Sequence, residues 1–234
     1  MEVYSNELAA GAVSSLEDAV ELLENAGGAT LGKEVATFIL PTIEGYTVEL
    51  NGADFEQIIG DDLTIVHPLT DKSVQVSYVV TDAAGETAIT NDIEYVVEGL
   101  YTQEEGNNSK PVVIPEIAEW YSDTTDQLSA ADIKYVAYTD AALDEVVDEF
   151  IADYEDFTGV VLEKVAADSV EGGISFALEA PDALLGEEGY VMDIQSDRIC
   201  VSSESVTGNM YGMQTILQTN QQDSESYSVG TMRD

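Results

Sequence analysis

Alternating apolar and polar positions dominate the first hundred residues of the chain. In residues 74–80, Val or Tyr occupies every second position. This period of two gives a β-strand one apolar face. Residues 46–50 and 93–97 are predicted to be further strands, and Asn51-Gly52 is a turn signal that ends the first of them. Short strands separated by turn signals about every 8–12 residues predict an immunoglobulin-like β-sandwich over residues 30–102.

A helix is predicted before this sandwich, within an N-terminal helical segment, residues 1–29. Ser14-Ser15-Leu16-Glu17 has the form of a capping box, in which a Ser side chain and a Glu three residues later satisfy each other's backbone donors. An apolar helical face follows and Gly27-Gly28 ends it, so the helix is expected over residues 14–26. Three short apolar runs are expected to add strands to the sandwich, at residues 35–40, 55–59 and 63–66.

The second half of the chain mixes helical and strand periodicities. Residues 103–111 are polar and rich in breakers, and they are predicted to link the two halves. Helices are expected over residues 141–157, ended by Thr158-Gly159, and over residues 205–219. The expected fold class is therefore two domains, an all-β sandwich and then an α+β domain over residues 111–222, with a mostly antiparallel sheet covered by two helices. Strands of that sheet are predicted at residues 112–114, 133–138, 160–162, 174–178, 190–194 and 199–202.

The charge of the chain excludes several classes of partner. Asp and Glu number 47 against 7 Lys and Arg, a formal net charge of −40. Such a surface repels phosphate backbones and anionic lipids, so neither nucleic-acid binding nor membrane insertion is expected. The acids are spread along the chain, which favours a solubility adaptation to salt or to an extracellular setting. The alternative, a cation-binding surface, lacks the Asp-x-Asp-x-Asp-Gly run of calcium loops.

Few residues are candidates for chemistry. The one cysteine, Cys200, lies between Ile199 and Val201 and is expected to be a buried structural thiol, so neither a disulfide nor a zinc cluster is predicted. The one histidine, His67, is expected at a turn or at the edge of a core. The sequence has no phosphate-binding, dinucleotide-binding or nucleophile-elbow motif, and it implies no cofactor and no metal.

The dipeptide Trp120-Tyr121 has polar neighbours on both sides. Aromatic faces stack on sugar rings, so one interpretation is a carbohydrate platform made by Trp120 and Tyr121. The other interpretation is packing within a core or between domains.

Three motifs in the second half occur in a recognisable order. Val113-Ile114-Pro115 comes first, followed by the predicted helix that ends in Asp156-Phe157-Thr158-Gly159. A strand that begins with Gly189-Tyr190 then precedes the pattern Gly-x-x-Tyr-Gly-x-Gln-Thr-x-x-Gln over residues 208–218. Together these motifs resemble the N-terminal α+β domain of glycoside hydrolase family 20, the β-N-acetylhexosaminidases.

The tail Val229–Asp234 resembles the strand that leads into the catalytic (β/α)8 barrel of that family, so residues 223–234 are expected to be a lead-in to a missing barrel. The resemblance implies substrate-assisted chemistry in the barrel, where an Asp-Glu pair follows a His-x-Gly segment. Asp144-Glu145 and Asp148-Glu149 follow neither His nor Gly, and their spacing is typical of an exposed helix face. No catalytic residue is therefore expected in this chain.

The resemblance implies that the chain is the non-catalytic N-terminal part of a β-N-acetylhexosaminidase-like glycoside hydrolase. Its partner would be the downstream catalytic barrel of the same polypeptide, and that barrel would bind the glycans. The chain alone should be inactive. Residues 40–71 also resemble immunoglobulin-like modules of secreted bacterial glycosidases, which implies an extracellular or cell-surface location. Two other functions stay open, a free-standing carbohydrate-binding or adhesion protein and a purely structural spacer.

The predicted second helix has one face built for close packing. Gly208 and Gly212 lie four residues apart on it, which would admit a strand or a barrel at short distance. Without the barrel, the apolar stripe over residues 210–217 would be unpaired and would promote self-association.

Overall fold

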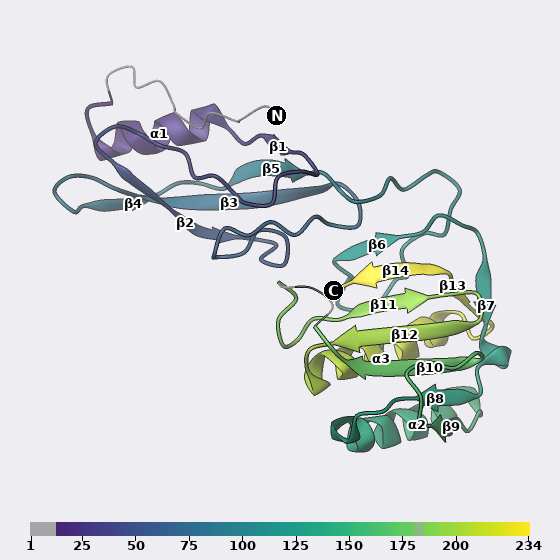
Figure 1. Ribbon diagram of the computed structural model, residues 1–234. Coiled ribbons are helices and arrows are strands. Elements are labelled where there is room, and N and C mark those ends of the chain that lie inside the picture. Colours follow the sequence, from purple (N-terminus) through teal and green to yellow (C-terminus); the bar gives the residue numbers. More distant parts are fainter. Residues whose placement is uncertain (1–12, 181, 183) are drawn as a thin grey trace. The chain divides into compact units, whose positions relative to one another are not determined.

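The computed structural model describes residues 13–180, 182 and 184–234. The chain divides into two compact units, one that ends at Leu100 and one that comprises Tyr101–Asp234. Each unit has its own cluster of buried apolar side chains. Figure 1 labels the helices and strands of both units.

The first unit is built on one five-stranded sheet, in the order β1-β5-β3-β2 with β4 paired to β3. β1 and β5 pair in parallel, and the other pairings are antiparallel. The central strand β3 alternates between buried and partly exposed residues, as the sequence predicts, and the side chains that enter the core are Val74, Val76, Tyr78 and Val80. The strands are β1 (Thr30–Leu31), β2 (Thr47–Ala53), β3 (Lys72–Thr81), β4 (Thr87–Ile89) and β5 (Ile93–Val97).

Helix α1 (Leu16–Ala26) packs its apolar face into the same core as this sheet. The predicted helix is confirmed, with a correction of one residue at its start. Ser15, and not Ser14, is the N-cap, because its hydroxyl oxygen accepts a hydrogen bond from the backbone N–H of Asp18. The carboxylate of Asp18 in turn accepts from the backbone and the hydroxyl of Ser14, so the capping arrangement is displaced by one position.

The expected two-sheet sandwich of the immunoglobulin type is not confirmed. The three short apolar runs that were predicted to add strands make only isolated bridges, such as Ile59 with Ile65, so those strand predictions are wrong. Their apolar side chains still enter the core, as Phe38 and Ile58 do, while local turns satisfy part of the backbone. Hydrophobicity determined which side chains are inside, but it did not determine how the backbone pairs.

The turn predicted at Asn51-Gly52 is also wrong. Strand β2 runs through these residues to Ala53, and its pairing with β3 shifts register there, which is a β-bulge. The side-chain amide of Asn51 donates to Oγ of Ser77 on β3 at 3.0 Å. The flexible backbone of Gly serves a bulge as well as a turn, which is why the dipeptide misleads.

A seven-stranded sheet in the order β6-β14-β11-β12-β10-β8-β9 forms the centre of the second unit, and β13 pairs separately with β7. The sheet is mixed, not mostly antiparallel as expected, because β12, β10, β8 and β9 pair in parallel. A crossover through helix α2 joins β8 to β9 and returns the chain in the same direction. The strands are β6 (Glu119–Tyr121), β7 (Gln127–Ser129), β8 (Tyr135–Ala137), β9 (Glu163–Val165), β10 (Gly173–Leu178), β11 (Val191–Ile194), β12 (Arg198–Ser203), β13 (Ser226–Ser228) and β14 (Gly230–Arg233).

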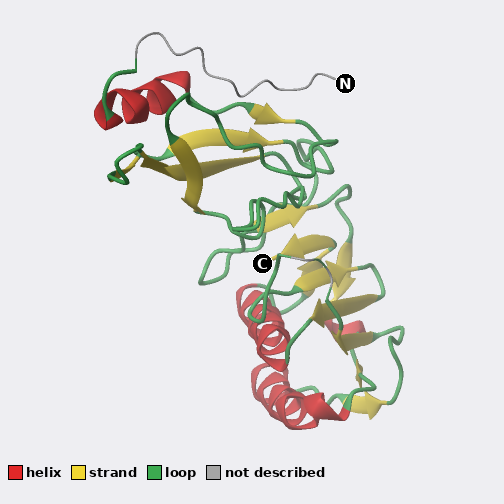
Figure 2. Ribbon diagram, turned by 60° about the vertical axis from the view of Figure 1, so that its left-hand side comes forward, coloured by secondary structure: helices red, strands yellow, loops and turns green. Residues whose placement is uncertain are grey.

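The two predicted helices of this unit are confirmed as α2 (Asp144–Thr158) and α3 (Val206–Gln222). Both lie on the same face of the sheet, as Figures 1 and 2 show from two directions. Short 3-10 turns, η1 (Ala130–Asp132) and η2 (Ala141–Leu143), lie before β8 and before α2. Gly159 caps α2 in the left-handed conformation, with φ of 73°.

Strand alternation divides the side chains between the covered and the open face of the sheet. One row across the strands is buried under the helices and comprises Trp120, Met232, Met192, Val201 and Phe176. The adjacent row must point to the opposite face. It comprises Tyr121, Thr231, Asp193 and Cys200, all partly exposed. The expected burial of Cys200 is therefore wrong, because Ile199 and Val201 take the core side.

Two predicted strands of this unit, at residues 112–114 and 160–162, are wrong. Residues 112–114 run beside α3, where the side-chain amide of Gln218 accepts from the N–H of Ile114 at 2.9 Å and donates to its carbonyl at 3.0 Å. Gln222 donates to the carbonyl of Val112 in the same way. Residues 160–162 lead into β9, which begins only at Glu163.

Replacing Gly159 tests the end of α2. Space is not limiting, because a Cβ added to Gly159 would meet no neighbouring atom within 4 Å. We therefore expect Gly159→Ala to lower the free energy of unfolding by about 1–2 kcal/mol through the left-handed backbone alone. Gly159→Asn should lower it less, because Asn tolerates this conformation. Urea unfolding measures both, and equal stabilities for the Ala and Asn variants would contradict the explanation.

Candidate functional site

Four distant segments of the second unit meet around the last residue of the chain. The backbone of Asp234 exchanges two hydrogen bonds with that of Tyr190, at 2.8 and 3.0 Å. Its carboxylate accepts from the backbone N–H of Ala118 at 2.6 Å. The hydroxyl of Tyr190 lies 2.7 Å from Oγ1 of Thr215 on α3 and 3.4 Å from the other carboxylate oxygen of Asp234. We call Ala118, Tyr190, Thr215 and Asp234 the Asp234 junction.

The junction is placed by close packing of helix α3 on the sheet. A Cβ on Gly208 would lie 2.0 Å from Oγ of Ser203 and 2.3 Å from the carbonyl oxygen of Gly189. A Cβ on Gly212 would lie 2.7 Å from Cγ1 of Val201. The close approach predicted from the two helix glycines is therefore confirmed, and its partners are β12 and the residues just before β11.

Tyr190 is buried where α3 packs on the sheet, and its hydroxyl is neutral. Its side chain is 1% exposed. Burial raises the pKa of Tyr190, and the carboxylate of Asp234 raises it further, while the hydrogen bond with Thr215 acts in the opposite direction. A neutral phenol both donates and accepts, so it can join the helix hydroxyl to the carboxylate of the last residue.

A buried ion cluster lies beside the junction. Arg233, on β14, is 5% exposed and contacts the carboxylates of Glu119 on β6 and Asp182 in the loop before β11. Its Nη2 donates to Oδ1 of Asp182 at 3.2 Å. Burial by itself would lower the pKa of Arg233, but the two carboxylates outweigh it and the pKa is raised. The guanidinium of Arg233 thus links β14 to β6 and to the loop before β11.

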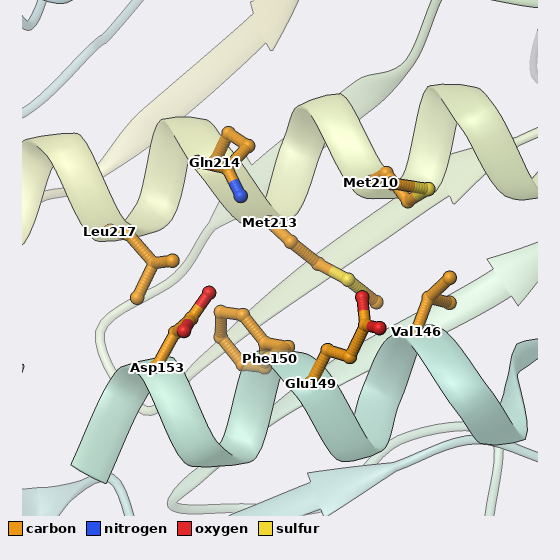
Figure 3. Close-up of a pocket in the computed structure, with 8 residues that line it drawn as sticks. All are labelled: Val146, Glu149, Phe150, Asp153, Met210, Met213, Gln214 and Leu217. Carbon is orange, nitrogen blue, oxygen red and sulfur yellow. The ribbon is translucent and has the colours of Figure 1, made fainter. Parts of the chain in front are cut away.

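A shallow groove runs between α2 and α3 (Figure 3). Phe150 and Met213, both buried, lie in it, and Met210 is 41% exposed at one end. Carboxylates of Glu149 and Asp153 project from α2 toward α3. The apolar stripe predicted to be unpaired is therefore mostly covered by α2 and leaves Met210 and its neighbour Tyr211 exposed. The full lining is Val146, Glu149, Phe150, Asp153, Met210, Met213, Gln214 and Leu217.

The acidic pairs of α2 have structural partners. Asp148 forms an ion pair with Lys164 at 2.5 Å, and Asp144 accepts a hydrogen bond from the hydroxyl of Tyr138 at 2.7 Å. Glu145 and Glu149 are exposed on the same helix. These contacts are those of an exposed helix surface.

His67 and Trp120 are held by backbone carbonyls. The ring nitrogens of His67 lie 2.8 Å from the carbonyl oxygen of Glu98 and 3.0 Å from that of Val35. Trp120 is 7% exposed, and its Nε1 donates to the carbonyl of Asn108 at 2.9 Å. The structure therefore separates the two members of the predicted platform, with Trp120 in the core and Tyr121 on the open face.

The part of the chain that the structure describes contains no cluster of three or more His, Cys, Asp or Glu side chains suited to a metal ion. None of its described helices is both long and apolar enough to cross a bilayer. Tyr190, Thr215, Arg233 and Asp234 are recognisable in the sequence only as parts of motifs. The buried ion cluster of Arg233 with Glu119 and Asp182 was not predicted, because a contact between distant segments leaves no local pattern.

Comparison with known families matches the second unit. The family described as "Glycosyl hydrolase family 20, domain 2" matches residues 110–234. No curated protein sequence matches the chain. The similarity to this domain covers the whole Asp234 junction and nearly all of the second unit.

Solved structures that resemble the chain include the N-acetyl-β-hexosaminidase of Streptomyces plicatus, with 21% identity over 56% of this chain and a TM-score of 0.45. The β-N-acetylhexosaminidase of Streptomyces coelicolor has 21% identity over 54% and a TM-score of 0.45. The exo-β-N-acetylglucosaminidase of Vibrio harveyi has 14% identity over 68% and a TM-score of 0.42. The matched part makes up 28%, 27% and 25% of those chains, so this chain spans about a quarter of their length.

Removal of the buried cation should be costly. We expect Arg233→Met to lower the free energy of unfolding by about 3–5 kcal/mol, because the buried carboxylate of Glu119 loses its ion pair with the guanidinium. Arg198→Met is the control, since Arg198 pairs with Asp197 at a solvent-screened site and its loss should cost much less. Chemical unfolding measures both variants, and similar losses would contradict the role of Arg233.

Alkaline pH should unfold the second unit through its buried tyrosines. Burial raises the pKa of Tyr190, Tyr154 and Tyr227 in the folded chain. Because the folded pKa exceeds the unfolded one, their stabilisation is complete below about pH 10 and is lost as the pH rises further. We expect these residues to ionise only as the unit unfolds, so tyrosinate absorbance and circular dichroism should change together. Ionisation of all 12 tyrosines near pH 10 in a folded chain would contradict this.

Proposed function

Because the chain belongs to glycosyl hydrolase family 20 through residues 110–234, we propose that it is the non-catalytic N-terminal part of a β-N-acetylhexosaminidase-like glycoside hydrolase. Its role is to support a catalytic (β/α)8 barrel that follows in the same polypeptide. The complete enzyme removes N-acetylhexosamine residues from glycans, and this chain alone does not hydrolyse them.

The Asp234 junction is the observation that carries this proposal. The motif residues Tyr190 and Thr215 converge on the final strand and its last residue, and not on a catalytic constellation. The position and direction of β14 are fixed by strand pairs on both sides and by the buried Arg233. A domain built to hold its last strand rigidly is suited to orient whatever the chain continues into.

The proposal assigns the remaining segments as follows. Residues 223–234 lead into the barrel, and residues 111–222 form the supporting α+β domain. Residues 30–102 are an accessory module of the immunoglobulin-like kind, preceded by the helical segment 1–29, and the setting is extracellular or at a cell surface. Support for a separate module comes from the independent core of the first unit.

The coding sequence after Asp234 provides the first test. We expect it to encode a further barrel domain that contains an Asp-Glu pair after His-x-Gly. The continued polypeptide should hydrolyse 4-nitrophenyl N-acetyl-β-D-glucosaminide, whereas residues 1–234 alone should not. A stop codon directly after Asp234, or hydrolysis by this chain alone, would overturn the proposal.

Substitution at the junction tests the supporting role in the continued polypeptide. Tyr190→Phe removes the hydroxyl between Thr215 and Asp234 and should cost about 1–2 kcal/mol of stability. The half-life of activity on heating should shorten, while KM should stay unchanged, because the substrate is bound elsewhere. Tyr211→Phe is the control, since Tyr211 is exposed on α3. A change in KM with unchanged thermal inactivation would count against a supporting role.

A further inference from the structure

Tyr121 lies on the open face of the seven-stranded sheet, away from the helices. It pairs across the strands with Thr231, which pairs with Asp193, and directly paired residues share one face. All three are partly exposed. The Oγ1 of Thr231 donates to Oδ1 of Asp193 at 3.1 Å. One end of the open face thus carries an aromatic ring beside small polar side chains.

A second tyrosine enlarges this aromatic surface. The ring centroid of Tyr101 lies 4.3 Å from that of Tyr121, with 13° between the ring planes. Tyr101 is 46% exposed. The side chain of Gln103 accepts from the backbone N–H of Ser122 at 3.0 Å, which fastens the Tyr101 segment beside β6. The stack is therefore held in place by the backbone and not only by the two rings.

Hydrogen-bonding groups surround the stack. Asp123 follows Tyr121 by two residues and Glu104 follows Tyr101 by three, so both carboxylates belong to the segments that carry the rings. Partial burial raises the pKa of Tyr121, and the carboxylates of Asp123 and Glu104 raise it further together with Tyr101. Both are exposed to solvent. Carboxylates accept hydrogen bonds, and a neutral tyrosine hydroxyl both donates and accepts.

We propose that Tyr101 and Tyr121, with the carboxylates of Glu104 and Asp123, form a binding site for a neutral oligosaccharide. A pyranose ring has an apolar C–H face that packs on an aromatic ring, and a rim of hydroxyls that donate to carboxylates. The net charge of −40 disfavours uronic or sulfated glycans. We call this surface the tyrosine platform. It goes beyond the supporting role proposed above and requires no barrel.

Binding to the full 234-residue chain tests the platform. The probes are tri-N-acetylchitotriose and cellotriose as neutral ligands, and tri-galacturonic acid as the anionic comparison. We expect saturation-transfer NMR signals from at least one neutral trisaccharide, with a dissociation constant of about 1 mM by calorimetry. The anionic trisaccharide should bind at least about tenfold more weakly.

Variants of Tyr101 test whether the flat aromatic ring itself is required for oligosaccharide binding. Tyr101→Leu keeps apolar bulk but removes the flat ring, and it should weaken binding at least about fivefold, whereas Tyr101→Phe should retain it. Tyr211→Leu is the matched control, because Tyr211 is also 46% exposed but lies on α3. Thermal unfolding establishes that each variant is folded.

Three results would overturn the platform. They are no binding of either neutral trisaccharide at about 10 mM, an equal loss of binding in the Tyr101→Leu and Tyr211→Leu variants, and preferential binding of the anionic probe. None of them bears on the barrel proposal, which depends on the coding sequence after Asp234 and on hydrolysis.

Discussion

The second unit depends on where its last strand is inserted. β14 lies between β6, the first strand of the unit, and β11, so the first and last strands of this unit pair at one edge of the sheet. β6 has no other neighbour in that sheet and would be lost without β14. The Asp234 junction and the ion cluster of Arg233 strengthen this same place. The motif residue Tyr190 is therefore among the residues that hold the end of the final strand.

Because basic residues are scarce, charge compensation inside the second unit depends strongly on the buried cation Arg233. With 47 acids and 7 bases, most carboxylates of this chain have no cation available and must remain in water or accept from backbone N–H groups. The carboxylate of Asp234 does the latter with Ala118, while buried Glu119 is matched with Arg233. Charge compensation at the end of the sheet is thus concentrated in one side chain, although the surface carries acid everywhere.

Much of the fold could be predicted from the sequence where periodicity is strong. The period of two in β3 and the helical periods of α2 and α3 give the correct elements, because one face of each is buried. The strand predictions for the apolar runs between α1 and β3 are wrong, since burial does not specify strand pairing. The strand prediction for residues 112–114 is wrong because glutamine side chains take the place of a neighbouring strand. In the candidate sites, the helix glycines were found by spacing. The ion cluster of Arg233 and the stacking partner of Tyr121 were not predicted, because each contact joins residues that are not neighbours in the sequence.

The position of β14 between β6 and β11 also determines the order in which the sheet can form during synthesis. A chain grows from its N-terminus at about 5–20 residues per second, and domains fold as units. The first unit can fold while the second is still being made, but β6 and β11 must wait for residues 230–233 before they become neighbours through β14. Until then both strands present unpaired edges, which are prone to aggregation. In a longer polypeptide, this sheet would close just as the next domain begins to emerge, so that domain would meet a finished surface.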